Sequence, residues 1–220
     1  MKKLVLLILG VTIMTLCFSC DKLFNKEDDP DVLSGDPSPM AEAGVEVSSS
    51  SAAIAGVSNF SATVTEFKDG ISTYTGSATV TNPVIKNMVA NFPGVTIDGN
   101  TVSIANMQMQ QTTEGIKCLT GPGAGVIVNY NSSVGDTYPM GTTDKVRTVV
   151  SKTGVDDYPY GFYLIKTIQV ESSPDGLKSA TGVSKITYIA NHKFGLVGVK
   201  VAFDDGTSST FPVYSSAQND

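Results

Sequence analysis

Apolar and polar residues alternate with a period of two along most of the chain after residue 53. Over residues 73–80, Tyr74, Ala78 and Val80 alternate with threonine and serine, and over residues 197–203 valine occupies every second position up to residue 201. This alternation places every second side chain on the same face of an extended strand and buries one of the two faces. The sequence therefore predicts a mainly β fold of half-buried antiparallel strands.

Other strand candidates are apolar, β-branched or aromatic runs bounded by turn residues. They cover residues 62–65, 101–109, 115–119, 125–130, 146–152, 161–171, 184–190 and 209–213. Five acid-glycine pairs lie between such runs: Asp69-Gly70, Asp98-Gly99, Glu114-Gly115, Asp175-Gly176 and Asp205-Gly206. Because tight hairpins need positive φ, these pairs indicate an up-and-down meander of roughly nine to eleven strands. A slip in the alternation at Asn106 indicates a β-bulge.

One segment follows a helical period instead. Asn82 is a suitable N-cap, Pro83 fits the first turn, and apolar residues follow at helical spacing until Pro93-Gly94. We expect one short helix at about residues 83–92, which packs on a sheet face or closes the end of a barrel. The chain then forms a single antiparallel meander that makes a barrel or a strongly curved sheet, with a two-sheet sandwich as the alternative.

The first 19 residues have the features of an export signal. The basic start Met1-Lys2-Lys3 precedes an apolar run over residues 4–16 that is too short to span a bilayer. The run ends in Cys17-Phe18-Ser19-Cys20, and a small residue directly before a cysteine resembles the lipobox of bacterial lipoproteins, although Cys17 departs from the usual leucine or valine. This resemblance implies cleavage before Cys20 and a membrane anchor made by acyl chains on that cysteine.

An acidic stretch follows the cysteine, with Asp21 directly after it and Glu27, Asp28 and Asp29 close behind. In enteric bacteria an aspartate at this place resembles an inner-membrane retention signal, whereas a short acidic stretch after the cysteine resembles the export signal of Bacteroidota surface lipoproteins. With its Thr-, Asn- and Gly-rich strands, the chain is similar to small lipoproteins of that second group. The resemblance implies an outer-membrane lipoprotein that faces the cell surface, and a periplasm-facing or inner-membrane anchored protein is the alternative.

Negative charge is concentrated in this tail. Residues 21–47 contain eight acids and two lysines, whereas residues 48–220 contain 13 acids and 11 bases. The tail is rich in Asp, Glu, Ser, Pro and Gly and has no apolar period, so we expect a lipid-anchored flexible spacer over residues 20–52. An all-β domain over residues 53–215 and a disordered C-terminus over residues 216–220 complete the expected organisation. No clustered basic face is visible for nucleic-acid binding.

Few residues offer catalytic or metal-binding chemistry. Cys118 has no cysteine to pair with once the signal is removed and Cys20 is acylated, and its apolar strand favours a structural role. His192 is the single histidine, so neither a nucleophile triad nor a zinc site can be assembled around it. The glycine-rich residues 121–125 lack the lysine and the helix start of a phosphate loop. We therefore expect no enzyme, no cofactor and no metal site.

One aromatic and acidic segment is the best candidate for contact with a ligand. Asp156, Asp157, Tyr158 and Tyr160 lie within five residues of one another, and Tyr138 lies upstream. Tyrosine rings beside acids and a proline can form a stacking platform for a sugar or a peptide. The alternative is that much of this cluster belongs to the core, because a predicted strand continues directly from it.

Three classes of function remain open. The first, which we expect, is a non-catalytic binding module at the cell envelope whose partner is a glycan, a peptide or an envelope protein. The second is a carrier or sensor of a hydrophobic ligand, which requires an interior cavity of about 300 Å³ or more. The third and least favoured is a hydrolase, for which the sequence offers no motif.

Overall fold

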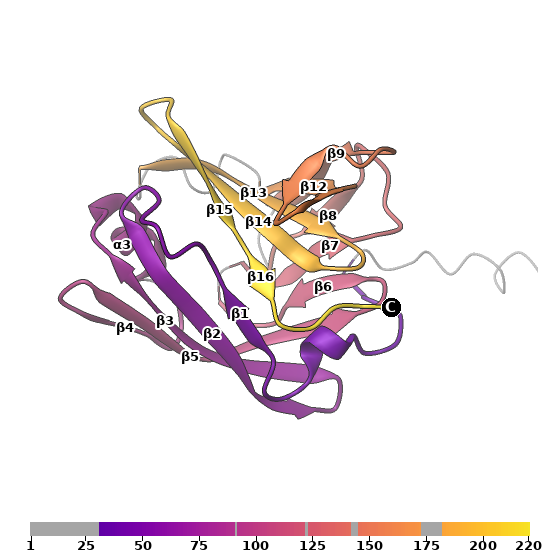
Figure 1. The fold of residues 1–220 in the computed structure, drawn as a ribbon, viewed down its shortest axis with the longest axis horizontal. Coiled ribbons are helices and arrows are strands. Elements are labelled where there is room, and N and C mark those ends of the chain that lie inside the picture. The colour runs from indigo at the N-terminus through magenta and orange to yellow at the C-terminus, as the bar shows by residue number, and fades with distance from the viewer. Residues whose placement is uncertain (1–30, 91, 122, 142–144, 173–181) are drawn as a thin grey trace, which may run out of the picture.

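The computed structural model describes residues 31–90, 92–121, 123–141, 145–172 and 182–220. This part of the chain forms sixteen strands, one α-helix and one 3-10 turn (Figure 1). The predicted mainly β fold is confirmed. The expected number of strands was too low because several strands are only two to four residues long, which is too short to show an alternation.

The strands belong to three sheets. The first sheet contains β1 (Glu46–Ser48), β2 (Val57–Lys68), β3 (Ile71–Val80), β4 (Val95–Asp98), β5 (Thr101–Thr112), β6 (Gly115–Cys118), β7 (Gly125–Asn129) and β16 (Tyr214–Ser215). The second sheet contains β8 (Thr137–Pro139), β9 (Val146–Lys152), β12 (Ile168–Ser172), β13 (Val183–Asn191), β14 (Gly195–Phe203) and β15 (Ser208–Pro212). A separate hairpin consists of β10 (Tyr158–Tyr160) and β11 (Tyr163–Ile165).

The strand order follows the chain almost without exception. The first sheet runs β16-β1-β2-β3-β5-β6-β7, with β4 paired to β5, and the second runs β15-β14-β13-β12-β9-β8. β7 ends the first sheet, β8 begins the second, and β16 returns to pair with β1. The result is the predicted antiparallel meander, curled into a half-barrel (Figure 1).

A hydrogen bond joins the two ladders at one seam, and the chain itself joins them at the other, where β15 continues through Val213 into β16. At the β7 seam, Arg147 of β9 donates from Nη1 to the carbonyl oxygen of Val126 at 3.0 Å. At the opposite edge, the Val213 N–H donates to the carbonyl oxygen of Val197 at 3.0 Å. These contacts make the two ladders parts of one curved surface.

The turn chemistry matches the sequence at three of the acid-glycine pairs, whereas Gly115 of Glu114-Gly115 begins β6 and does not have the expected positive φ. Asp69-Gly70 connects β2 to β3 with φ of 52° and 78°, and glycines with positive φ also occupy the turns after β4 and β14. Asp175-Gly176 lies outside the described residues. Asn106 has φ of 59°, and the pairing of β3 with β5 shifts register opposite it, which confirms the predicted bulge.

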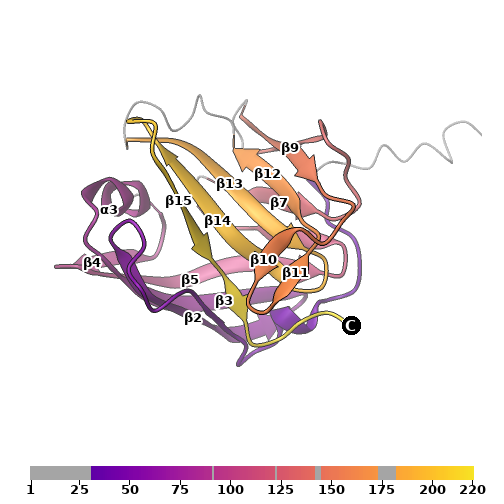
Figure 2. The same cartoon turned by 45° about the horizontal axis from the view of Figure 1, so that its top comes forward.

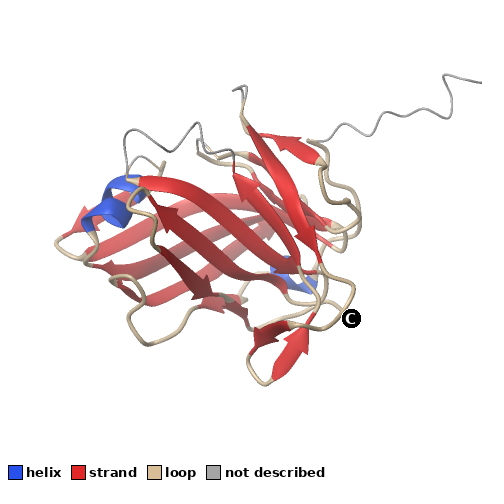
Figure 3. Cartoon of the chain, turned by 90° about the horizontal axis from the view of Figure 1, so that it is seen from above, coloured by secondary structure: helices blue, strands red, loops and turns tan. Residues whose placement is uncertain are grey.

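The helix α3 (Pro83–Val89) forms where the sequence predicts it but ends three residues earlier. Asn82 Oδ1 accepts hydrogen bonds from two backbone N–H groups of the first turn, at 2.9 and 3.3 Å. Ile85 is buried with Val80 and Val102. The helix therefore lies against one end of the half-barrel (Figure 3).

Residues 31–52 belong to the fold, whereas we expected a flexible spacer as far as residue 52 and a domain that begins at residue 53. Leu33 and Met40 are buried, a 3-10 turn forms at Pro39–Ala41, and β1 pairs with both β2 and β16. The apolar residues of this segment stand singly among serine, proline and glycine. They show no period because each fills a site formed by distant strands.

The C-terminal residues also differ from the expected disorder over residues 216–220. Asn219 is buried and its N–H donates to the carbonyl oxygen of Lys193 at 2.8 Å. Its Oδ1 accepts a hydrogen bond from Ser38 Oγ at 2.7 Å. The two segments expected to be loose therefore hold each other in place.

The strand expected over residues 161–171 is divided in two. β11 ends at Ile165 and β12 begins at Ile168, and between them the Thr167 N–H donates to Thr153 Oγ1 at 2.8 Å. This break lets β10 and β11 form a hairpin that packs against β14 from outside the half-barrel (Figure 2). Val197 of β14 is buried under it.

Candidate functional site

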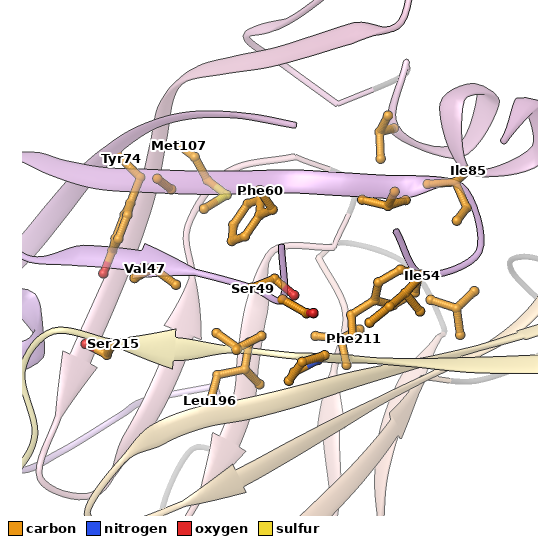
Figure 4. A pocket seen from close by; sticks show the side chains of 18 of the residues that line it. Val47, Ser49, Ile54, Phe60, Tyr74, Ile85, Met107, Leu196, Phe211 and Ser215 are labelled. Carbon is orange, nitrogen blue, oxygen red and sulfur yellow. The ribbon is translucent and has the colours of Figure 1, made fainter. Parts of the chain in front are cut away.

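A cavity of about 380 Å³ lies inside the half-barrel. β1, β2, β3, β5 and β6 supply one wall, β14 and β15 supply the other, and α3 lies at one end. The cavity extends from Tyr74 to Ile85 (Figure 4). Figure 4 labels the side chains of Val47, Ser49, Ile54, Phe60, Tyr74, Ile85, Met107, Leu196, Phe211 and Ser215 around it.

The walls are apolar because the inward positions of the alternating strands are apolar. Phe60 and Ala62 line the cavity from β2, and Val199 and Val201 line it from β14. Among the described residues that line it, none is Asp, Glu, Lys, Arg or His. Four of the seven methionines of the chain also line it: Met40, Met88, Met107 and Met109. Because the methionine side chain is flexible and polarisable, such a wall adapts to ligands of irregular shape.

One end of the cavity is closed and carries a polar pair. Gln111 Nε2 donates to Tyr74 Oη and to the carbonyl oxygen of Met40, the latter at 3.3 Å, and all three residues are buried. Burial raises the pKa of Tyr74 to about 12, so the phenol is neutral at physiological pH. This end therefore presents a hydroxyl and an amide without a charge.

Another side of the cavity is only partly covered. Ser49, Ser50 and Ala52, between β1 and β2, are half-buried or exposed although they line the cavity. The same holds for Pro212 and Val213, where β15 leads into β16. The opening therefore lies between the β1–β2 connection and the β15–β16 connection.

The residues predicted to contact a ligand do not line this cavity. Asp156 and Asp157 are exposed in the loop before β10, and Tyr158 and Tyr160 are half-buried on β10. Burial raises the pKa of both tyrosines. Their hairpin covers the side of β14 opposite the cavity, so any ligand platform they form is a separate surface.

Tyr138 lies apart from the other two tyrosines. It is buried on β8 in a core cluster with Val128 and Val149, and its Oη accepts a hydrogen bond from the Asn129 N–H at 3.3 Å. Burial raises the pKa of Tyr138 as well. The structure therefore brings together Tyr158 and Tyr160 but not Tyr138.

A second pocket of about 150 Å³ lies at the ends of β9, β12 and β13 and includes His192 in its lining. Tyr130 Oη and Thr167 Oγ1 in this lining are buried with no hydrogen-bond partner in the described part of the chain. Lys152 Nζ donates to the carbonyl oxygens of Tyr130 and Ser132, at 3.0 and 2.8 Å. Small polar pockets of this kind commonly hold ordered water.

Other candidate chemistry is sparse in the described residues. No group of three or more His, Cys, Asp or Glu side chains among them could hold a metal ion. Cys118 is half-buried and its Sγ donates to the carbonyl oxygen of Thr120 at 3.2 Å. None of the described helices is long and apolar enough to cross a membrane. Cys20, the predicted lipidation site, lies outside the described residues.

Comparison of the chain with protein-family models, with curated proteins and with solved structures finds no match. Sequence reasoning identified most strands of the cavity but not the cavity residues themselves. A signal was present in β5, where Met107, Met109 and Gln111 occupy successive positions of one face. Long flexible side chains there, in place of β-branched ones, are typical of a wall that does not pack tightly.

Proposed function

We propose that this chain is a non-catalytic, membrane-anchored lipoprotein whose half-barrel binds a hydrophobic molecule. The observation that carries the proposal is the apolar cavity of about 380 Å³, whose described lining residues bear no charge. Small-molecule sites usually have volumes of roughly 300–1,000 Å³. Burial of apolar ligand surface contributes about 25 cal/mol per Å², so a ligand needs few hydrogen bonds to bind here.

The lining also limits the chemistry of the ligand. An ionised group inside the cavity would lose its hydration without gaining a charged partner, so the buried part of the ligand is neutral. A single hydroxyl, carbonyl or ester group is best placed near Tyr74 and Gln111, where the polar atoms of the closed end lie. The open side, by the serines, suits the more polar end of an elongated molecule.

Binding can be tested with the neutral dye N-phenyl-1-naphthylamine, which fluoresces in apolar surroundings. We expect saturable binding to the chain without its first 20 residues, because every described residue is kept. Val199→Trp places a large ring in the cavity and should abolish binding. Val150→Trp, at a position of β9 that is 42% exposed, is the matched control and should leave binding unchanged. Equal binding by both variants, or none by the native chain, would refute the proposal.

The anchor is the second part of the proposal. Acyl chains on Cys20 stabilise membrane attachment by about 0.8 kcal/mol per buried methylene, and the acidic stretch after it favours the outer membrane with the domain facing outward. Cys20→Ala should abolish the incorporation of labelled palmitate and lower the amount of the protein in the membrane fraction. Protease treatment of intact cells then separates a surface-facing protein, which is digested, from a periplasm-facing one.

A second candidate function is binding of a glycan, a peptide or an envelope protein at β10. The observation that favours it is the placement of Tyr158 and Tyr160 on one hairpin beside the exposed Asp156 and Asp157. Thermal-shift screening with glycans and peptides tests this surface, because a ligand that binds the folded state raises Tm. A shift that Tyr160→Ala abolishes and Val199→Trp leaves intact would identify β10 as the site.

A further inference from the structure

The tip of the β10–β11 hairpin exposes three consecutive large apolar side chains. Phe162 is fully exposed, Tyr163 is 66% exposed and Leu164 is 59% exposed. They follow Gly161, whose φ of 58° makes the tight turn. Large apolar side chains gathered at one exposed place usually mark a site of contact with another apolar phase.

One side of the hairpin, in contrast, is packed against the half-barrel, and this includes Tyr160, which pairs with Tyr163 directly beside the turn. The Tyr160 ring lies 5.0 Å from the Phe194 ring and 5.3 Å from the Tyr214 ring. Ile165, at the other end of the hairpin, is buried with Ile189 and Val197. Phe162, Tyr163 and Leu164 are therefore exposed on a hairpin that the core holds in place even beside its turn.

We propose that this tip inserts into the interfacial region of a lipid bilayer. A stable protein interface needs about 800 Å² on each partner, far more than three side chains at a turn can provide. A bilayer needs no complementary shape, and phenylalanine, tyrosine and leucine are residues that enter its interface. Asp156 and Asp157 are exposed just before β10, so the contact rests on apolar burial and does not depend on anionic lipid.

The chain length before the fold also favours a bilayer as the partner. The described structure begins at Asp31, and Cys20 precedes it by 11 residues, which span at most about 40 Å. If Cys20 carries lipid, as proposed above, the domain cannot leave the vicinity of the membrane surface. The tip then has a bilayer within reach at all times.

Docking of the tip would bring the cavity wall close to the lipid. Phe194, which stacks on Tyr160, also lines the cavity, and so do Val213 and Ser215 on either side of Tyr214. The hairpin thus contacts β16 at Tyr214, directly after Val213, which lines the cavity. The ligand of the cavity is then a hydrophobic molecule that resides in the membrane. This statement about the ligand rests on the proposed cavity function.

The chain contains no tryptophan, so Phe162→Trp introduces a single fluorescent reporter at the tip. The chain without its first 20 residues is suitable for this test, since the described elements of the fold and the contacts between them lie within residues 31–220. With neutral phosphatidylcholine vesicles, the emission should shift to shorter wavelength, and brominated acyl chains should quench it. Ile97→Trp on β4, at the other end of the molecule (Figure 2), is the matched control and should show neither effect.

A second measurement keeps the test independent of the reporter. Flotation of the otherwise native chain with the same vesicles should fall at least tenfold in the double variant Phe162→Ser with Leu164→Ser. Equal shifts at Phe162→Trp and Ile97→Trp, or unchanged flotation of the double variant, would overturn the proposal. A shift that depends on protein concentration without vesicles would overturn it in favour of contact between two copies. Dye binding without vesicles reports on the cavity alone. Failure of ligand binding in the cavity is therefore distinguishable from failure of the hairpin to insert into a bilayer.

Discussion

The two sides of the half-barrel follow the same strand alternation but differ in whether their inward side chains meet. On the solid side, β7, β9, β12 and β13 pack together, and Val128, Val170 and Ala190 are fully buried. On the hollow side, β2, β3 and β5 face β14 and β15 across the cavity, which Val199 borders. The comparison teaches that alternation determines which residues point inward, whereas the separation of the walls determines whether they touch.

The largest effect is expected at Arg147, which holds the seam on the solid side. Its side chain is 1% exposed, donates to the carbonyl oxygens of Gly123 and Val126, and lies 5.7 Å from the centre of the Tyr188 ring. Arg147→Ala should lower the free energy of unfolding by about 3–5 kcal/mol, because it removes two charge-assisted hydrogen bonds and leaves a cavity. Urea unfolding measures this loss.

Arg147→Lys is the control for this seam. It keeps the charge but cannot reach both carbonyl groups with one planar fork, so it should recover only part of the lost stability. A loss of less than about 1 kcal/mol in Arg147→Ala would mean that the ladders alone hold the solid side together.

The same substitution on each side tests the comparison directly. Val170→Ala removes two methyl groups from the solid core, which costs about 1.6 kcal/mol of transfer free energy and about 1.2 kcal/mol for the new void, or about 3 kcal/mol in all. Val199→Ala enlarges a cavity that already exists and should cost less than about 1 kcal/mol. Equal losses in thermal or urea unfolding would show that the hollow side is packed in solution.

The two sides of the half-barrel also show which features could be predicted from the sequence and which could not. The strands, the helix after Asn82 and the bulge at Asn106 follow from local patterns, because each depends on neighbouring residues. The cavity depends on the distance between β2 and β14, which are more than a hundred residues apart in sequence. No local pattern reports that distance, so Phe60 and Val199 could be predicted to face inward but not to face a cavity.

The prediction of a flexible spacer over the amino-terminal segment was wrong for a different reason. Leu33, Met40 and Val45 are buried apolar residues in a stretch whose composition is typical of a flexible chain. Each is buried because a distant element provides the site, and Gln111 Nε2 donates to the carbonyl oxygen of Met40. Composition therefore predicted the local tendency correctly and missed the tertiary contacts that override it.

The pH dependence of the free energy of unfolding tests the burial of Tyr74 on the hollow side. Its phenol ionises near pH 10 in the unfolded chain and near pH 12 in the folded one, because burial disfavours the charged form. The stabilisation is fully present below pH 10 and is lost as the pH rises through 12, by up to about 2.5 kcal/mol. Tyr74→Phe should reduce the loss of unfolding free energy in this pH range. Part of the loss should remain, because burial also raises the pKa of Tyr130, Tyr138, Tyr158 and Tyr160.

The smallest effects are expected in the hairpin that covers the hollow side from outside. Tyr160→Ala removes ring contacts to Phe194 and Tyr214 and should cost about 1–2 kcal/mol in unfolding free energy. Phe162→Ser should change stability by less than about 0.5 kcal/mol, because the ring is fully exposed and packs against nothing. A loss above 1 kcal/mol at Phe162 would mean that the tip packs against the fold, which would leave no apolar surface for a bilayer. A neutral result, together with weaker vesicle binding, separates two side chains of one short hairpin: Tyr160 stabilises the fold, whereas the apolar surface of Phe162 at the turn is kept for contact.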